Sequence, residues 1–159
     1  MAKSNLKIKT ATSKKDKTFL NVTYKSKLEK TMAMLLHSEK LPVRYEEEEF
    51  TLFPEIKTDL QSIKRSINGK GKLMSRIKRK HRAIKYTPDF CDYKENLGLE
   101  GSFIIEVKGY PTPEFILRYR LFERYCTKNL PNVTLYMPRS VADCEKVVEL
   151  IKENYVHRR

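Results

Sequence analysis

The stretch that most constrains the fold of this chain is residues 103–110, FIIEVKGY, where two charged side chains interrupt an apolar run. A short run rich in isoleucine, valine and phenylalanine is typical of a buried β-strand. Because successive strand side chains point to opposite faces, Glu106 and Lys108 share a face with Ile104. Burying a carboxylate and an ammonium together is costly unless they pair or bind an ion. The pattern therefore predicts a buried sheet that carries a polar site.

A second β-strand that carries an acidic residue is expected shortly before residues 103–110. Residues 83–90, AIKYTPDF, have strand character, and the turn-prone residues 95–98 lie between the two stretches. In a β-hairpin these strands would bring Asp89 close to Glu106 and Lys108. Two neighbouring carboxylates form the kind of oxygen site that Mg²⁺ prefers, with Mn²⁺ able to substitute. An ammonium beside the metal can orient water or offset charge on a phosphate. The pattern indicates hydrolysis of a phosphodiester.

Together, Pro88, Asp89, Glu106 and Lys108 resemble the core motif of the PD-(D/E)xK, or restriction-endonuclease-like, nuclease superfamily. That motif is Pro-Asp, a variable gap, and Glu-x-Lys on the next strand. The resemblance covers most of residues 24–155, and residues 86–90 with 106–124 look like the small phage-encoded endonucleases. It implies a Mg²⁺-dependent DNA endonuclease of a phage or mobile element, acting in DNA recombination, repair or processing. Asp89 and Glu106 would bind the metal, the Val107 carbonyl would add a ligand, and Lys108 would serve the water or the transition state.

The resemblance also implies an α/β fold with a restriction-endonuclease-like core. Its central mixed sheet is flanked by helices, in the order helix, three antiparallel strands, helix, strand, helix. The sequence can be divided in that order. Helices are expected over residues 26–41, over residues 112–128 and after Ser140, and strands over residues 45–53, 83–90, 103–110 and 133–137. A chain of 159 residues suits one domain, which we place at residues 23–159.

Glu29, in the first turn of the first expected helix, has two interpretations. Small phage nucleases often supply an additional acid from such a helix, and Lys27-Leu28-Glu29 matches that position, so Glu29 would be an auxiliary catalytic acid and metal ligand. Alternatively, Ser26-x-x-Glu29 is a capping box, in which the glutamate reaches back to the first backbone N–H of the helix. The four glutamates at residues 46–49 also leave two options. One of them helps to hold the metal or its waters, or all are solvated on a strand and neutralised by the nearby basic insertion at about residues 55–82.

The net charge of +13 is concentrated in two segments. Residues 1–27 carry eight Lys/Arg and one acid, and residues 55–85 carry eleven and two, whereas residues 86–159 carry eleven of each. Such localisation is expected of a surface that binds a polyanion. We predict a flexible basic arm over residues 1–22 and a flexible or hairpin-like DNA-gripping insertion at about residues 55–82, with a helical pattern over residues 56–65. The expected DNA contacts are Lys78, Arg79, Lys80, Arg118, Arg120 and Arg124.

Several classes of protein are disfavoured. Cys91, Cys126 and Cys144 are odd in number and lack CxxC spacing, which argues against a disulfide framework and a zinc site and predicts buried, reduced thiols. No apolar stretch suits a membrane span or a secretory signal, so we expect a cytoplasmic protein, in the host cytoplasm if phage-encoded. The expected partner is DNA, and the chain could act as a homodimer. Two alternatives stay open: a basic nucleic-acid-binding protein without catalysis, and an interaction module in which the charged triad is a structural salt bridge.

Overall fold

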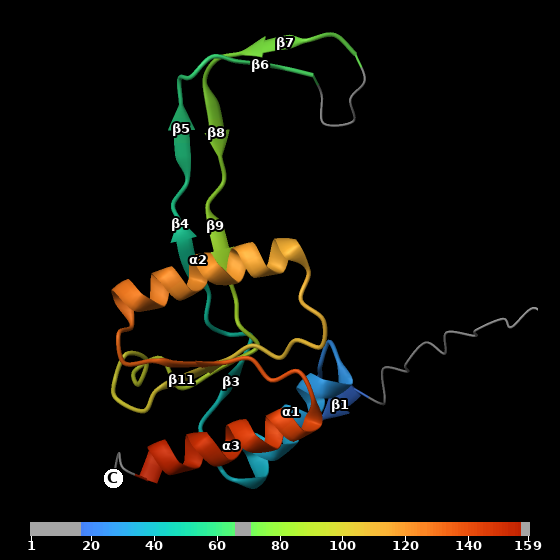
Figure 1. The fold of residues 1–159 in the computed structure, drawn as a ribbon, viewed down its shortest axis with the longest axis vertical. Coiled ribbons are helices and arrows are strands. Elements are labelled where there is room, and N and C mark those ends of the chain that lie inside the picture. Colours follow the sequence, from blue (N-terminus) through green and yellow to red (C-terminus); the bar gives the residue numbers. More distant parts are fainter. Residues whose placement is uncertain (1–16, 66–70, 157–159) are drawn as a thin grey trace, which may run out of the picture.

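A computed structural model describes residues 17–65 and 71–156 of the chain. At its centre lies a four-stranded mixed sheet with the strand order β12-β11-β10-β3 (Figure 1). β10 runs antiparallel to both β11 and β3, while β11 and β12 run parallel. These strands are β3 (Arg44–Tyr45), β10 (Phe90–Cys91), β11 (Phe103–Ile105) and β12 (Thr134–Tyr136).

Helices cover both faces of this sheet, α1 and α3 on one face and α2 on the other (Figure 1). They are α1 (Lys27–Ser38), α2 (Pro113–Asn129) and α3 (Val141–Val156). Alternation along β11 explains the division: Phe103 and Ile105 join the core with α1 and α3, whereas Ile104 joins the core with α2. The described part of the chain is therefore mixed α/β, with three helices and several small sheets that include the mixed four-stranded sheet.

The three helices begin where the sequence predicts. The hydroxyls of Ser26, Thr112 and Ser140 each accept a hydrogen bond from the backbone N–H three residues later, at 3.0, 3.2 and 3.1 Å. Each bond satisfies an N–H group that has no partner within its own helix. Pro113 adds to this at the start of α2, because its fixed φ suits the first helical turn.

Two of the predicted strands are broken, and the breaks face each other. Residues 45–53 divide into β3 and β4 (Phe50–Phe53), and residues 83–90 divide into β9 (Ile84–Tyr86) and β10. Pro88 has no N–H to donate in the second break. Glu46 has a left-handed φ of 51° in the first break, and its N–H donates to the Asp89 carbonyl at 3.0 Å. The prediction of two continuous strands is therefore wrong, and Asp89 lies at a bend.

β4 and β9 pair with each other and begin a long two-stranded arm that projects from the domain beside α2 (Figure 1). The arm continues through paired strands β5 and β8, and then β6 and β7. Their bounds are β5 (Ile56–Thr58), β6 (Ser62–Lys64), β7 (Met74–Arg76) and β8 (Arg79–His81). The described residues of this segment, within 56–81, thus form paired antiparallel strands. The prediction of a helix over residues 56–65 is wrong: pairing of these residues with residues 74–81 outweighs the weak helical periodicity of the local sequence.

Most of the predicted basic arm at residues 1–22 lies outside the described residues. Its described part, from residue 17 on, belongs to a small antiparallel hairpin of β1 (Thr18–Phe19) and β2 (Val22–Thr23). The ring of Phe19 contacts His37 of α1 edge-on, with ring centroids 5.6 Å apart. This contact places the hairpin against the first helix.

The cysteine prediction is confirmed: Cys91, Cys126 and Cys144 are buried and unpaired. Between residues 17 and 156, leaving out residues 66–70, no helix is both long and apolar enough to cross a membrane.

Candidate active site

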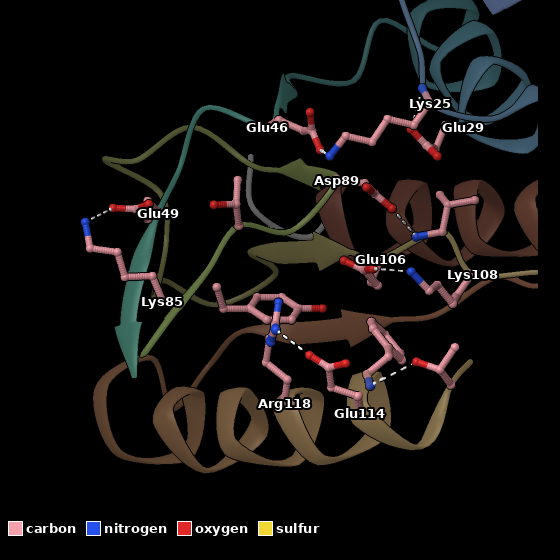
Figure 2. A pocket seen from close by; sticks show the side chains of 15 residues that line it. Lys25, Glu29, Glu46, Glu49, Lys85, Asp89, Glu106, Lys108, Glu114 and Arg118 are labelled. Carbon is pink, nitrogen blue, oxygen red and sulfur yellow. Dashed lines mark hydrogen bonds and ion pairs between the residues drawn. The ribbon is translucent and has the colours of Figure 1, made fainter. Parts of the chain in front are cut away.

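One pocket of about 600 Å³ gathers most of the predicted site residues (Figure 2). It lies where the end of β11 meets the starts of α1 and α2 and the base of the arm. Six of the predicted residues line it: Glu29, Asp89, Glu106, Val107, Lys108 and Arg118. Glu46 and Glu49, from the acidic run in which one residue was a possible aid to metal binding, also line it. The rest of the lining was not predicted as part of the site: Lys25, Lys85, Tyr86, Thr87, Thr112, Glu114 and Phe115.

Asp89 is buried at the bend between β9 and β10, with 8% of its surface exposed. Its Oδ2 accepts a 2.7 Å hydrogen bond from the backbone N–H of Val107 (Figure 2). Burial, reinforced by the nearby charge of Glu106, raises the pKa of Asp89 to about 8. The bond from Val107 favours the ionised form but offsets only part of this effect.

Glu106 and Lys108 directly follow β11 and extend its pairing with the segment around β12. The N–H of Glu106 donates to the Tyr136 carbonyl at 2.9 Å, and that of Lys108 donates to the Pro138 carbonyl at 3.1 Å. Glu106 is 7% exposed, and burial raises its pKa. The Tyr86 hydroxyl and the charge of Lys108 both oppose that rise in the pKa, and the Lys108 Nζ lies 3.9 Å from Glu106 Oε1. The same Nζ is 4.5 Å from the centroid of the Phe115 ring, which also attracts a cation.

This pair of acids fits a divalent cation. A raised pKa means that the protein alone under-stabilises the ionised carboxylates, and a bound cation would favour that form. In the part of the chain that the structure describes, no three Asp, Glu, His or Cys side chains already form a metal cage. Mg²⁺ needs only one or two carboxylates, because water and substrate phosphate fill its other positions. The Val107 carbonyl stays a predicted ligand; its N–H is the group seen to contact Asp89.

Glu29 combines features of both of its interpretations. Its N–H bonds to Ser26 Oγ as a capping box requires, but its carboxylate accepts from the N–H of Lys25, at 3.1 Å, instead of that of Ser26. The Tyr45 hydroxyl donates to the same Oε2 at 2.7 Å. Glu29 is nonetheless 5% exposed, lines the pocket, and contributes to the raised pKa of Asp89. The hydrogen bonds from Lys25 and Tyr45 both go to Oε2 of Glu29.

Two further Lys–Glu pairs lie at the edge of the pocket (Figure 2). Lys25 pairs with Glu46, and Lys85 Nζ lies 2.5 Å from Glu49 Oε1. Lysines therefore pair with the acidic run, but these two lie outside the basic insertion at about residues 55–82 that was expected to neutralise it. Sequence reasoning missed both lysines, because a single lysine before a helix or within a basic segment has no distinguishing pattern.

The six basic residues expected to contact DNA lie in three places. Arg118 lines the pocket, with Nη2 3.1 Å from Glu114 Oε1. Arg120 lines a different pocket, and Arg124, four residues later, shares that face of α2. Lys78, Arg79 and Lys80 lie on the arm, just before and within β8. Of the six, the structure brings Arg118 alone to the acids.

The pocket thus combines buried acids that suit a cation with an ammonium and a guanidinium that suit a phosphate. Tyr86, another member of its lining, has a buried hydroxyl beside these acids. The chain matches no protein-family model, no curated protein and no solved structure.

Proposed function

We propose that this chain is a Mg²⁺-dependent DNA endonuclease of the PD-(D/E)xK type. The observation that carries the proposal is that Asp89, Glu106 and Lys108, which the sequence motif singles out, line one pocket. The element order and the mixed sheet support it, because they are those expected of a restriction-endonuclease-like core. A structural salt bridge explains the site less well. If Lys108 fully balanced the charges of both carboxylates, the pKa of Asp89 would not be raised to about 8.

Each residue of the pocket has a definite part in the proposed reaction. Asp89 and Glu106 hold the cation, which supplies a Lewis acid for the scissile phosphate. Lys108, whose side chain is 35% exposed, orients the attacking water and offsets negative charge that builds up on the phosphate. Arg118, at the far wall, can contact a neighbouring phosphate once it leaves Glu114. The water oxygen then bonds to phosphorus as the ester bond to the leaving oxygen breaks.

The test is cleavage of defined DNA substrates by the purified chain with and without Mg²⁺. Linear, nicked, flapped and four-way DNA are the informative set, because the fold alone does not select among them. Metal-dependent cleavage supports the proposal. Binding of all substrates with no cleavage in Mg²⁺ or Mn²⁺ would instead establish the second candidate, a non-catalytic nucleic-acid-binding protein, which the basic residues of the two-stranded arm from β4 to β9 favour. Light scattering on the same samples gives the number of chains, since cutting both strands needs two active sites or two binding events.

Glu29→Gln is expected to lose most cleavage activity while the melting temperature changes little. A glutamine oxygen can still accept the bonds from Lys25 and Tyr45, so the start of α1 keeps its support. The negative charge facing the pocket is lost. Rates under saturating Mg²⁺, measured beside melting curves, give both quantities. Retained activity with a modest loss of stability would show that Glu29 only caps the helix.

Changing Lys78, Arg79 and Lys80 to Ala is expected to weaken DNA binding similarly for all sequences and to reduce its salt dependence. Each phosphate contact on duplex DNA contributes about −0.9 to the slope of log affinity against log salt, so the slope should become shallower by about one unit per lost contact. Turnover on saturating DNA should persist, because the pocket is unchanged.

The matched control replaces Lys94, Lys128 and Lys146, which are exposed and lie outside the arm and the pocket. It removes the same charge and should leave the salt slope nearly unchanged. Equal slopes for wild type and the arm variant would show that DNA is held elsewhere, with Arg120 and Arg124 as the next candidates.

A further inference from the structure

Tyr45 links the helix that carries Glu29 to the strand that follows Asp89. It ends β3, where it pairs across the strands with Phe90, the residue after Asp89. Its hydroxyl donates to Oε2 of Glu29 at 2.7 Å, and the same oxygen accepts the N–H of Lys25 at 3.1 Å. Two donors on one oxygen restrict the rotation of this buried carboxylate. The position of the Tyr45 hydroxyl therefore determines where the Glu29 carboxylate lies.

The ring of Tyr45 is itself held by two aromatic neighbours. The Tyr24 ring meets it edge-on, with centroids 4.6 Å apart, and the Phe90 ring lies tilted at 5.2 Å. Tyr24 and Phe90 belong to the core that the sheet shares with α1 and α3, and Tyr45 packs against that core. Because core side chains are closely packed in preferred rotamers, the core sets the position of the Tyr45 hydroxyl.

The residue after Tyr45 contacts the other members of the same site. Glu46 has a left-handed φ of 51°, which is uncommon for a residue with a side chain. In this conformation its N–H donates to the Asp89 carbonyl at 3.0 Å, and its carboxylate pairs with the Lys25 ammonium (Figure 2). Backbone in such sparsely populated conformations is concentrated at functional sites. Tyr45 and Glu46 together thus hold Glu29, Lys25 and the bend at Asp89.

Helix capping alone does not account for this arrangement. A capping glutamate needs only a backbone N–H at the start of its own helix, whereas Glu29 also takes a hydroxyl from a neighbouring strand. It is 5% exposed and lines the pocket that contains Asp89 and Glu106. Among the described residues these acids do not already form a metal cage. Mg²⁺ keeps several waters, so an acid beyond the two ligands can act on it through one of them, provided that the acid is held in place.

We propose that Tyr45 is a positioning residue: its hydrogen bond holds the Glu29 carboxylate at the wall of the pocket, where the negative charge of Glu29 helps to retain the cation bound by Asp89 and Glu106. This inference rests on the proposed function, and it adds a residue that the sequence motif does not include. Partners that orient the acids of a metal site typically change metal affinity or activity by about 10- to 100-fold when they are removed.

Tyr45→Phe tests the inference, because it removes the hydroxyl and keeps the ring. Titration of metal-free protein with Mn²⁺, without DNA, should show about tenfold weaker binding than in wild type. The matched control is Tyr24→Phe, which removes a hydroxyl from the neighbouring ring and keeps the bonds from Lys25 and Tyr45 to the Glu29 carboxylate. Its Mn²⁺ affinity should match that of wild type.

A double-mutant cycle distinguishes positioning of Glu29 from general support of the fold. If Tyr45 acts through the Glu29 carboxylate, adding Tyr45→Phe to Glu29→Gln should weaken Mn²⁺ binding little further, because the charge that Tyr45 places is already gone. Melting curves of the metal-free variants accompany the titrations. A Tyr45→Phe protein that melts at a lower temperature but binds Mn²⁺ as wild type does would show that the hydroxyl only stabilises the fold. A further tenfold loss of affinity in the Glu29→Gln background would also overturn the inference.

The same measurements separate the role of Tyr45 from the proposed function. If wild-type protein binds Mn²⁺ and cleaves DNA but Tyr45→Phe binds Mn²⁺ equally well, the role of Tyr45 alone fails. If wild-type protein neither binds Mn²⁺ nor cleaves DNA, the proposed function fails and the role of Tyr45 fails with it.

Discussion

Replacing Asp89 by Asn or Glu106 by Gln is expected to lower the rate of DNA cleavage by about a thousandfold or more, while DNA stays bound. Each change removes a charge that holds the cation, and the cation contributes several kcal/mol of transition-state stabilisation. Binding should persist or tighten, because one fewer negative charge repels the phosphates. Cleavage under saturating Mg²⁺ and binding in the absence of metal measure the two effects separately. Wild-type rates in both variants would eliminate the metal site.

The free energy of unfolding of Asp89→Asn shows whether the variant is folded. The pKa of Asp89 predicts whether this free energy is higher or lower than that of wild type. This pKa rises from 3.8 to about 8 on folding, so between those values the folded protein binds more protons than the unfolded chain. The free energy of unfolding of metal-free wild type should therefore fall as pH rises through this window and level off above it. Asp89→Asn lacks the titrating group, so its curve should be flatter. At pH 8 the variant should be more stable than wild type by up to a few kcal/mol.

Lys108→Ala is expected to reduce turnover by roughly a hundredfold or more, with a much smaller change in metal affinity. The ammonium lies 3.9 Å from Glu106 Oε1 and faces the pocket, so it can act on the water or the phosphate without being a metal ligand. Single-turnover rates and Mn²⁺ titration distinguish these two effects.

Lys146→Ala controls for the loss of one positive charge, because Lys146 lies on α3 and pairs with Glu149. Its rate should match that of wild type. If Lys108→Ala lost metal affinity and turnover in equal measure, Lys108 would be acting through Glu106, and its assignment to the reacting groups would be wrong.

The sequence predicted helices well and strand continuity poorly, for physical reasons that particular residues illustrate. Ser26, Thr112 and Ser140 set helix starts through bonds to residues three positions away, so the signal is local. The arm depends on pairs such as Ile56 with His81, which no local pattern records. The strand breaks at Glu46 and Pro88 lie opposite each other. Only the second break contains a residue, Pro88, from which a break can be predicted.

The residues of the candidate site, too, could be predicted only where a local sequence pattern marks them. Asp89, Glu106 and Lys108 were predicted because their chemistry is concentrated in two short motifs. Tyr86 stands three residues before Asp89 but has the ordinary appearance of a strand aromatic. Its place in the lining of the pocket becomes visible only when Phe50 and Phe122 are in position around it.

The two strands of the arm leave and re-enter the domain side by side, at the Phe50–Tyr86 pair. Such an insertion can lengthen or shorten without displacing its ends, because each removed pair, such as Thr58 with Arg79, comes from both strands at once. The arm can therefore be rebuilt or exchanged with a different hairpin while the domain keeps its pocket. Under the proposed function, such an exchange would change the DNA that the chain binds and leave the chemistry of the pocket in place.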